Sequence, residues 1–272
     1  YISVTGVQTC ALPICQLGWQ VVPAKLPAEH QSWKRPVIPW KEYTTGALTS
    51  DNTFSSWYGP GGQHAHRQNM GLITGAVSQT FVLDVDLQKA GGAGLWISAL
   101  RDQHLEGADF ETACQKTGGG GLQYYFRAPQ GWQAPTFKSE LGIDVRGEGG
   151  FAMLPPSLHE SGRHYEWIEG REPWAVGINE APPFLIEAID RLSAAEQFLS
   201  GGEPDEGYQP QPGTRSAFGT LTDGRESYMA RLVWAAVVDL YRESPIIPSN
   251  EVLQERMREA RSEEHTSELQ PH

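Results

Sequence analysis

Asp84 and Asp86 close an apolar, β-prone run that covers residues 80–87. Side chains alternate across a strand, so both carboxylates are expected on one face of a buried strand. Two neighbouring carboxylates repel each other and lose hydration, which is costly unless a positive group lies between them. A divalent cation is the simplest such group, because hard ions such as Mg²⁺ take carboxylate oxygens and also bind phosphates. The alternative is a strand end whose acids reach water or pair with basic residues.

A third acid lies on another predicted strand. Asp144 and Arg146 alternate with Ile143 and Val145, so the acid and the arginine are expected on one strand face. Three acids on two neighbouring strands can hold two Mg²⁺ or Mn²⁺ ions about 3.5–4 Å apart. Such a site suits phosphoryl chemistry, in which the protein mainly positions groups and stabilises charge.

A run of four glycines, Gly118 to Gly121, separates two predicted strands at residues 110–116 and 122–127. Glycine-rich loops beside strands permit close approach of phosphates to the backbone. The run is not the Gly-x-x-x-x-Gly-Lys loop of nucleotidases, because no Lys-Ser or Lys-Thr follows it. A flexible hairpin turn explains the run equally well.

The spacing of apolar residues predicts the remaining elements. Helices are expected over residues 50–58, 95–101 and 182–192, and residues 69–75 are expected to pair with residues 80–87 as a hairpin. We interpret residues 193–223 as a polar linker and residues 224–260 as the start of a truncated helical domain. The fold class that follows is α+β, with a mainly antiparallel sheet and flanking helices.

Both ends of the chain resemble a translated sequencing adapter. Back-translating residues 4–14 and taking the reverse complement yields residues 261–270 in frame, so we exclude residues 1–15 and 261–272 from fold reasoning. We expect the natural protein to extend beyond the fragment in both directions. The last segment carries one Arg and three Glu and the first carries no charge, so excluding them changes the net charge from −12 to −10.

Composition narrows the function classes. The acidic balance argues mildly against a protein coated in nucleic acid, although it leaves room for a local basic groove. Cys114 is the only cysteine outside the predicted adapter and its junction, which excludes a disulfide framework and fits a reducing cytoplasm. No apolar run approaches membrane-spanning length, so no membrane partner is expected.

The order of the motifs resembles the N-terminal domain of bifunctional DNA primase/polymerases, within the archaeo-eukaryotic primase superfamily. The resemblance covers roughly residues 16–192 and implies a primase-like catalytic domain there. It rests on six motifs in order: Gly18-Trp-Gln-Val-Val-Pro, Asn69-Met-Gly-Leu-Ile-Thr-Gly, Val82-Leu-Asp-Val-Asp, Thr117-Gly-Gly-Gly-Gly, Ile143-Asp-Val-Arg-Gly and Pro155-Pro-Ser-Leu-His-Glu-Ser-Gly.

The resemblance implies a template-dependent nucleotidyltransferase that makes and extends primers, acting on a DNA template and primer with NTP or dNTP. The implied catalytic residues and metal ligands, for Mg²⁺ or Mn²⁺, are Asp84, Asp86 and Asp144. The family has a histidine where this chain has Gln123, which leaves the phosphate contact at this position open. A helicase or ATPase module is expected C-terminal to the fragment. The expected nucleotide-binding residues are Gln123, Arg146, Gly120, Gly121, Lys34 and Arg35.

Two other functions fit part of the pattern. Haloacid-dehalogenase-like phosphatases also place Asp-x-Asp after an apolar strand, but their motif continues to a Thr, whereas Leu87 and Gln88 follow here. A catalytically weak module that binds nucleotides or DNA in replication is the second alternative. Gln123 favours that module, and the three acids argue against it.

Overall fold

The computed structural model describes residues 17–199, except residues 30, 31, 46–48, 66–68, 89–92, 107 and 140. The predicted adapter ends, the predicted helical domain over residues 224–260 and most of the predicted linker lie outside these residues. The chain divides into two compact units. Among the described residues, one unit lies within residues 17–88, 111–136 and 144–181, and the other lies within residues 93–110, 137–143 and 182–199.

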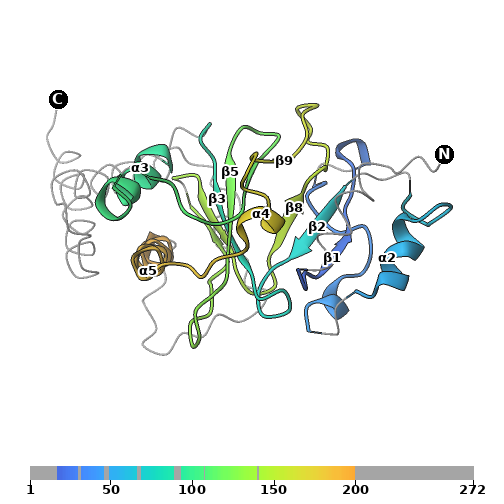
Figure 1. Ribbon diagram of the computed structural model, residues 1–272, viewed down its shortest axis with the longest axis horizontal. Coiled ribbons are helices and arrows are strands. Elements are labelled where there is room, and N and C mark those ends of the chain that lie inside the picture. Colours follow the sequence, from blue (N-terminus) through green and yellow to red (C-terminus); the bar gives the residue numbers. More distant parts are fainter. Residues whose placement is uncertain are drawn as a thin grey trace, which may run out of the picture. The chain divides into compact units, whose positions relative to one another are not determined.

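The first unit contains a small three-stranded sheet of β1 (Val21–Pro23), β2 (Met70–Ile73) and β8 (Phe151–Leu154). The strands lie in the order β1-β2-β8, and both pairs are antiparallel. Every residue of the central strand β2 is buried. Helix α2 (Asp51–Tyr58) lies beside β1 and β2 (Figure 1). It begins as predicted, because the Ser50 hydroxyl caps it by accepting from the Thr53 amide.

A larger sheet carries the predicted acids. Its order is β6-β7-β3-β5-β4-β9, and the pairs β3–β5, β4–β5 and β4–β9 are antiparallel. Asp84 on β3 lies directly opposite Gln123 on β5, and Gln123 lies opposite Gln115 on β4. The bounds are β3 (Phe81–Val85), β4 (Cys114–Lys116), β5 (Leu122–Phe126), β6 (Phe137–Lys138), β7 (Ile143–Arg146) and β9 (Glu166–Trp167).

The main core of the first unit joins its two sheets. Val82 and Tyr125 of the larger sheet share one buried cluster with Met70 and Leu72 of the smaller sheet. Trp19 stacks on the Tyr125 ring with their centroids 5.2 Å apart. Burying each large apolar side chain contributes about 1.5–3 kcal/mol, so this cluster fixes the larger sheet in place. Three short helices complete the unit: η1 (Pro27–Glu29), η2 (Lys41–Tyr43) and α4 (Pro173–Val176).

The second unit is built on α3 (Ala93–His104) and α5 (Pro183–Leu199). The His104 imidazole stacks on Phe184, with ring centroids 4.3 Å apart. Leu185, Ile189 and Leu192 are buried, as their helical spacing predicts. The helix continues to Leu199, past residue 192 and into the range predicted as linker. No helix in the described part of the chain has the length and apolarity to cross a membrane.

The α+β class and the antiparallel sheets are confirmed, but the predicted hairpin of residues 69–75 with residues 80–87 is wrong. β2 and β3 belong to different sheets, and only Gly75 and Thr80 form a bridge between the two segments. The reason is that both edges of β2 are taken by β1 and β8, while β3 lies between β7 and β5. The turn therefore passes the chain from one sheet to the other.

Candidate active site

Two of the predicted acids reach the site from adjacent strands. Asp84 projects from β3, and Asp144 projects from the neighbouring strand β7. Ile143 and Val145 are fully buried while Asp144 and Arg146 are partly exposed, so β7 alternates as the sequence predicts. This alternation places the Arg146 guanidinium on the same strand face as Asp144.

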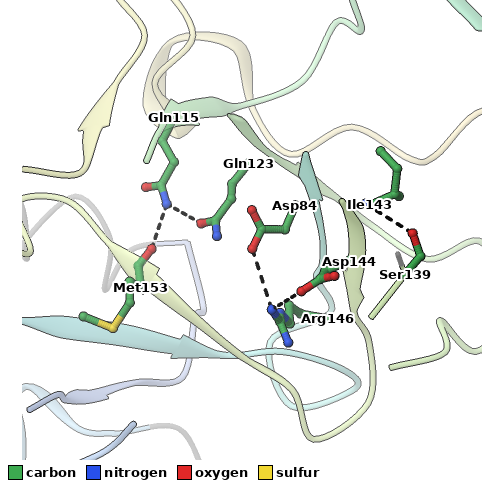
Figure 2. A network of polar contacts seen from close by, with 8 residues as sticks. All are labelled: Asp84, Gln115, Gln123, Ser139, Ile143, Asp144, Arg146 and Met153. Carbon is green, nitrogen blue, oxygen red and sulfur yellow. Dashed lines mark hydrogen bonds and ion pairs between the residues drawn. The ribbon is translucent and has the colours of Figure 1, made fainter. Parts of the chain in front are cut away.

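Arg146 bridges the two acids. Its Nη2 donates to Asp144 Oδ2 at 2.7 Å and lies 3.7 Å from Asp84 Oδ2 (Figure 2). The three side chains are only 20–22% exposed, so water screens the interaction weakly. One positive group thus lies between two carboxylates that would otherwise repel each other.

The surroundings of Asp84 disfavour the ionised form of its carboxyl group. Burial raises the pKa of Asp84 above its usual 3.8, and the nearby Asp144 raises it further. Arg146, a hydrogen bond from Gln123 and the charge of Lys34 each lower that pKa, and burial prevails over them. Asp84 therefore gains from any additional positive charge placed next to it.

Asp86 does not join the other two acids. β3 ends at Val85, and the Asp86 carboxylate is exposed and accepts from the backbone amide of Gln88. Among the residues that the structure describes, no group of three or more His, Cys, Asp or Glu side chains is arranged to hold a metal ion. The three predicted ligands therefore do not form one cluster in this conformation.

Asp84 and Asp144 nevertheless fit a divalent metal by their chemistry. Both present carboxylate oxygens, which are the donors that Mg²⁺ and Mn²⁺ prefer. Both already face one shared cation, the Arg146 guanidinium, which shows that a positive charge is accommodated between them. Asp86 is the third predicted ligand, and it lies directly after the end of β3, two residues from Asp84.

Gln123 lies directly opposite Asp84 in the strand ladder, at the position where the resemblance leads us to expect a histidine. Its side chain is 5% exposed, and its hydrogen bond lowers the pKa of Asp84. Its Oε1 accepts from Gln115 Nε2 at 2.5 Å, and the same Gln115 nitrogen donates to the Met153 carbonyl at 2.7 Å. Gln115 is not among the site residues expected from the sequence. Pairing the two strands across the glycine run would have placed it opposite Gln123.

The glycine run forms a tight turn. The amide of Gly120 donates to the Thr117 carbonyl, and the amide of Gly121 donates to the Thr117 hydroxyl. Both predicted phosphate donors are therefore engaged within the turn in this conformation. A side chain at Gly121 would lie 2.5 Å from the Val85 carbonyl, and Gly120 has a φ of +98°. The two glycines thus have packing and backbone roles of their own.

Lys34 acts on the acid site from a loop of the same unit. Its exposed ammonium lies over the Trp33 ring, 5.3 Å from the centroid, and its charge lowers the pKa of both Asp84 and His159. His159 packs edge-on against Trp33 and accepts from the Ser161 amide, as expected of a turn histidine. Arg35 is exposed, and no contact within the described residues ties its guanidinium to the acids.

Comparison with known families identifies the family of the chain. The family model for the N-terminal domain of bifunctional DNA primase/polymerases matches residues 11–184, which include both sheets and all three acids. The match begins inside the segment predicted as adapter. It leaves the phosphatase alternative without support. No curated protein matches the sequence at a significant level. The chain belongs to the bifunctional DNA primase/polymerase N-terminal family, a family of primase/polymerase-type nucleotidyltransferases.

Proposed function

We propose that the protein is a template-dependent nucleotidyltransferase that synthesises and extends primers on DNA. The observation that carries the proposal is the convergence of Asp84 and Asp144, from adjacent strands, on one shared positive group. Family membership indicates the reaction class, and this pair of acids is the candidate catalytic site for that reaction.

The residues around the acids favour a triphosphate. Arg146 offers a planar fork of donors that matches phosphate oxygens, and it is already within reach of both acids. Lys34 adds positive charge from the neighbouring loop. Gln123 contributes a neutral amide donor, where a protonated histidine would contribute a charged one. We assign these three side chains to the incoming nucleotide. Arg35, Gly120 and Gly121 have weaker support.

Asp84 and Asp144, with Asp86, are the residues that would hold Mg²⁺ or Mn²⁺. When bound, the metal would activate the attacking hydroxyl and neutralise charge on the leaving pyrophosphate. The chain itself must favour the ionised form of Asp84 against its burial, and Arg146, Gln123 and Lys34 each lower its pKa in that direction. Substrates would be a DNA template and primer with NTP or dNTP. By resemblance, the priming would be coupled to a helicase or ATPase module.

A primer-synthesis assay tests the proposal. The full chain is incubated with single-stranded DNA, Mn²⁺ or Mg²⁺, and either ribo- or deoxyribonucleotides, and both product length and released pyrophosphate are measured. We expect template-dependent products and pyrophosphate from the wild type and neither from Asp84→Asn. Equal incorporation by wild type and Asp84→Asn would show that Asp84 does not serve the reaction.

A binding module without catalysis is the second candidate, and one observation favours it. Arg146 contacts both Asp84 and Asp144, while Asp86 accepts from the following turn, so each acid has a partner in the protein without a metal. The same assay separates the two candidates. Binding of nucleotide or DNA by the wild type, without pyrophosphate release under any of the metal and nucleotide conditions, would favour the binding module.

A further inference from the structure

The buried side chain of Gln115 connects the smaller sheet to the acid site. Gln115 is fully buried, and its Nε2 donates both of its hydrogens, one to the Met153 carbonyl of β8 and one to Gln123 Oε1 (Figure 2). Gln123 in turn lies directly opposite Asp84 in the β3–β5 ladder. The three polar groups therefore form a chain that begins at a backbone carbonyl and ends at the acids.

The direction of this chain is fixed by chemistry. A backbone carbonyl can only accept, so the Met153 oxygen requires the NH₂ end of Gln115. Gln115 then offers its second hydrogen to Gln123, which must present its oxygen to receive it. As a result, the NH₂ end of Gln123 is left for the Asp84 side. Reversing the Gln115 amide would bring two acceptors together at both contacts, and reversing the Gln123 amide would bring two donors together.

We propose that Gln115 is a positioning residue for nucleotide binding, because it fixes which end of the Gln123 amide faces the acid site. A donor there stabilises the Asp84 carboxylate and can bond a triphosphate oxygen, whereas a carbonyl oxygen there would repel both. The cost of the arrangement is visible, since Gln115 Oε1 is buried without a hydrogen-bond partner among the described residues. An apolar side chain would avoid that cost, which indicates that the direction of the amide matters.

This inference rests on the proposed nucleotidyltransferase function and deepens it. It assigns to Gln115 no contact with substrate, since the side chain is fully buried between Met153 and Gln123. Its effect must therefore pass through Gln123. If Gln115 only supported the fold, its replacement would lower the stability of both sheets, and its effect on the site would not depend on Gln123.

A double-mutant cycle in the full chain tests this. Gln115→Glu is nearly isosteric and removes the NH₂ group that donates both hydrogen bonds, and Gln123→Met removes the amide that is positioned. We expect Gln115→Glu to raise the KM for the nucleotide about tenfold, with a smaller change in kcat. In the Gln123→Met background, the same change should alter KM less than twofold, because the group through which Gln115 acts is gone. Gln20→Glu, at another fully buried glutamine, is the matched control and should leave KM unchanged.

The direction of the amides is tested without activity by NMR. Couplings through hydrogen bonds should connect the Gln115 side-chain nitrogen to the Met153 carbonyl carbon and to the Gln123 side-chain carbonyl carbon in the wild type. A wild-type KM in Gln115→Glu, additive effects in the cycle, or absence of these couplings would each overturn the positioning role. A wild type that incorporates no nucleotide under any condition would count against the proposed function, and the NMR result would still decide the direction of the amides.

Discussion

Replacing Arg146 with Met should destabilise the protein and make it more responsive to divalent metal. The methionine keeps most of the apolar stem of Arg146 and removes the guanidinium that contacts Asp144 at 2.7 Å and lies 3.7 Å from Asp84. The two carboxylates are then left facing each other, partly desolvated, with no positive group between them. The loss of the guanidinium contacts and the repulsion between the two carboxylates both destabilise the folded state.

The size of the effect follows from the burial of the three groups. Removing one partner of a fully buried ion pair costs about 3–5 kcal/mol. These side chains are 20–22% exposed, so water recovers part of the loss. We expect the free energy of unfolding to fall by about 2–4 kcal/mol in metal-free buffer. For a domain of this size, that corresponds to a Tm lowered by roughly 5–15 °C.

Divalent metal should restore part of that stability, because a metal ion can replace the lost guanidinium between the acids. A ligand that binds only the folded state adds about 1.4 kcal/mol at ten times its Kd and about 2.7 kcal/mol at a hundred times. Thermal unfolding is measured with and without MgCl₂ or MnCl₂ for the wild type, Arg146→Met and Arg163→Met. Arg163 is exposed and is the matched control, with an expected change within about 0.5 kcal/mol.

Either of two outcomes would contradict this role of Arg146. If Arg146→Met is as stable as the wild type in metal-free buffer, Arg146 does not neutralise the acids. If metal raises the Tm of both proteins equally, the metal does not occupy the position that the guanidinium leaves. The second outcome would also weaken the assignment of Asp84 and Asp144 as metal ligands.

Three further predictions concern single residues. Burial raises the pKa of Asp84 above 3.8, so the folded protein holds this proton more tightly than the unfolded chain, and the stability gained from the protonated carboxyl is lost as the pH rises above about 4. The Tm of Asp84→Asn should therefore exceed the wild-type Tm by a margin that grows with pH in metal-free melts. A difference that stays constant with pH would contradict this. Gly121→Ala should cost about 1–3 kcal/mol of unfolding free energy, because the new methyl meets the Val85 carbonyl at 2.5 Å, whereas Gly119→Ala, with 3.6 Å to its nearest atom, should cost less in the same melts. Gln123→His should tighten nucleotide binding on the order of tenfold, more at pH 6 than at pH 8, since an imidazolium adds a charged contact; titrations with equal affinity at both pH values would show that position 123 does not touch the phosphates.

Local patterns in the sequence predicted the individual elements well. The alternation of Asp144 and Arg146 with two buried apolar residues gave the correct strand face, because period-two burial is a property of the strand alone. The Ser50 cap gave the start of α2 for the same reason, since capping depends on neighbouring residues. Both predictions needed no knowledge of distant contacts.

Pairing between strands was harder to predict, because the partner of each strand depends on which other strands compete for its two edges. The segments around β2 and β3 are adjacent in sequence and apolar, which favours a hairpin. β8, distant in sequence, occupies one edge of β2, and β5 occupies one edge of β3. Two sheets with one shared core result. The sequence contains no local signal for this division.

Asp86 shows the limit of spacing as a guide to a metal site. The Asp-x-Asp spacing predicts two carboxylates on one face only if the strand continues through both, and here β3 ends at Val85. Aspartate also readily accepts from a backbone amide two residues on, and Asp86 does so with Gln88. That single hydrogen bond to a carboxylate contributes about 1.5–3 kcal/mol at most, and water competes for it because Asp86 is exposed. A divalent cation held by Asp84 and Asp144 would offer Asp86 a stronger partner, so the turn after β3 is where we expect the chain to adjust when metal binds.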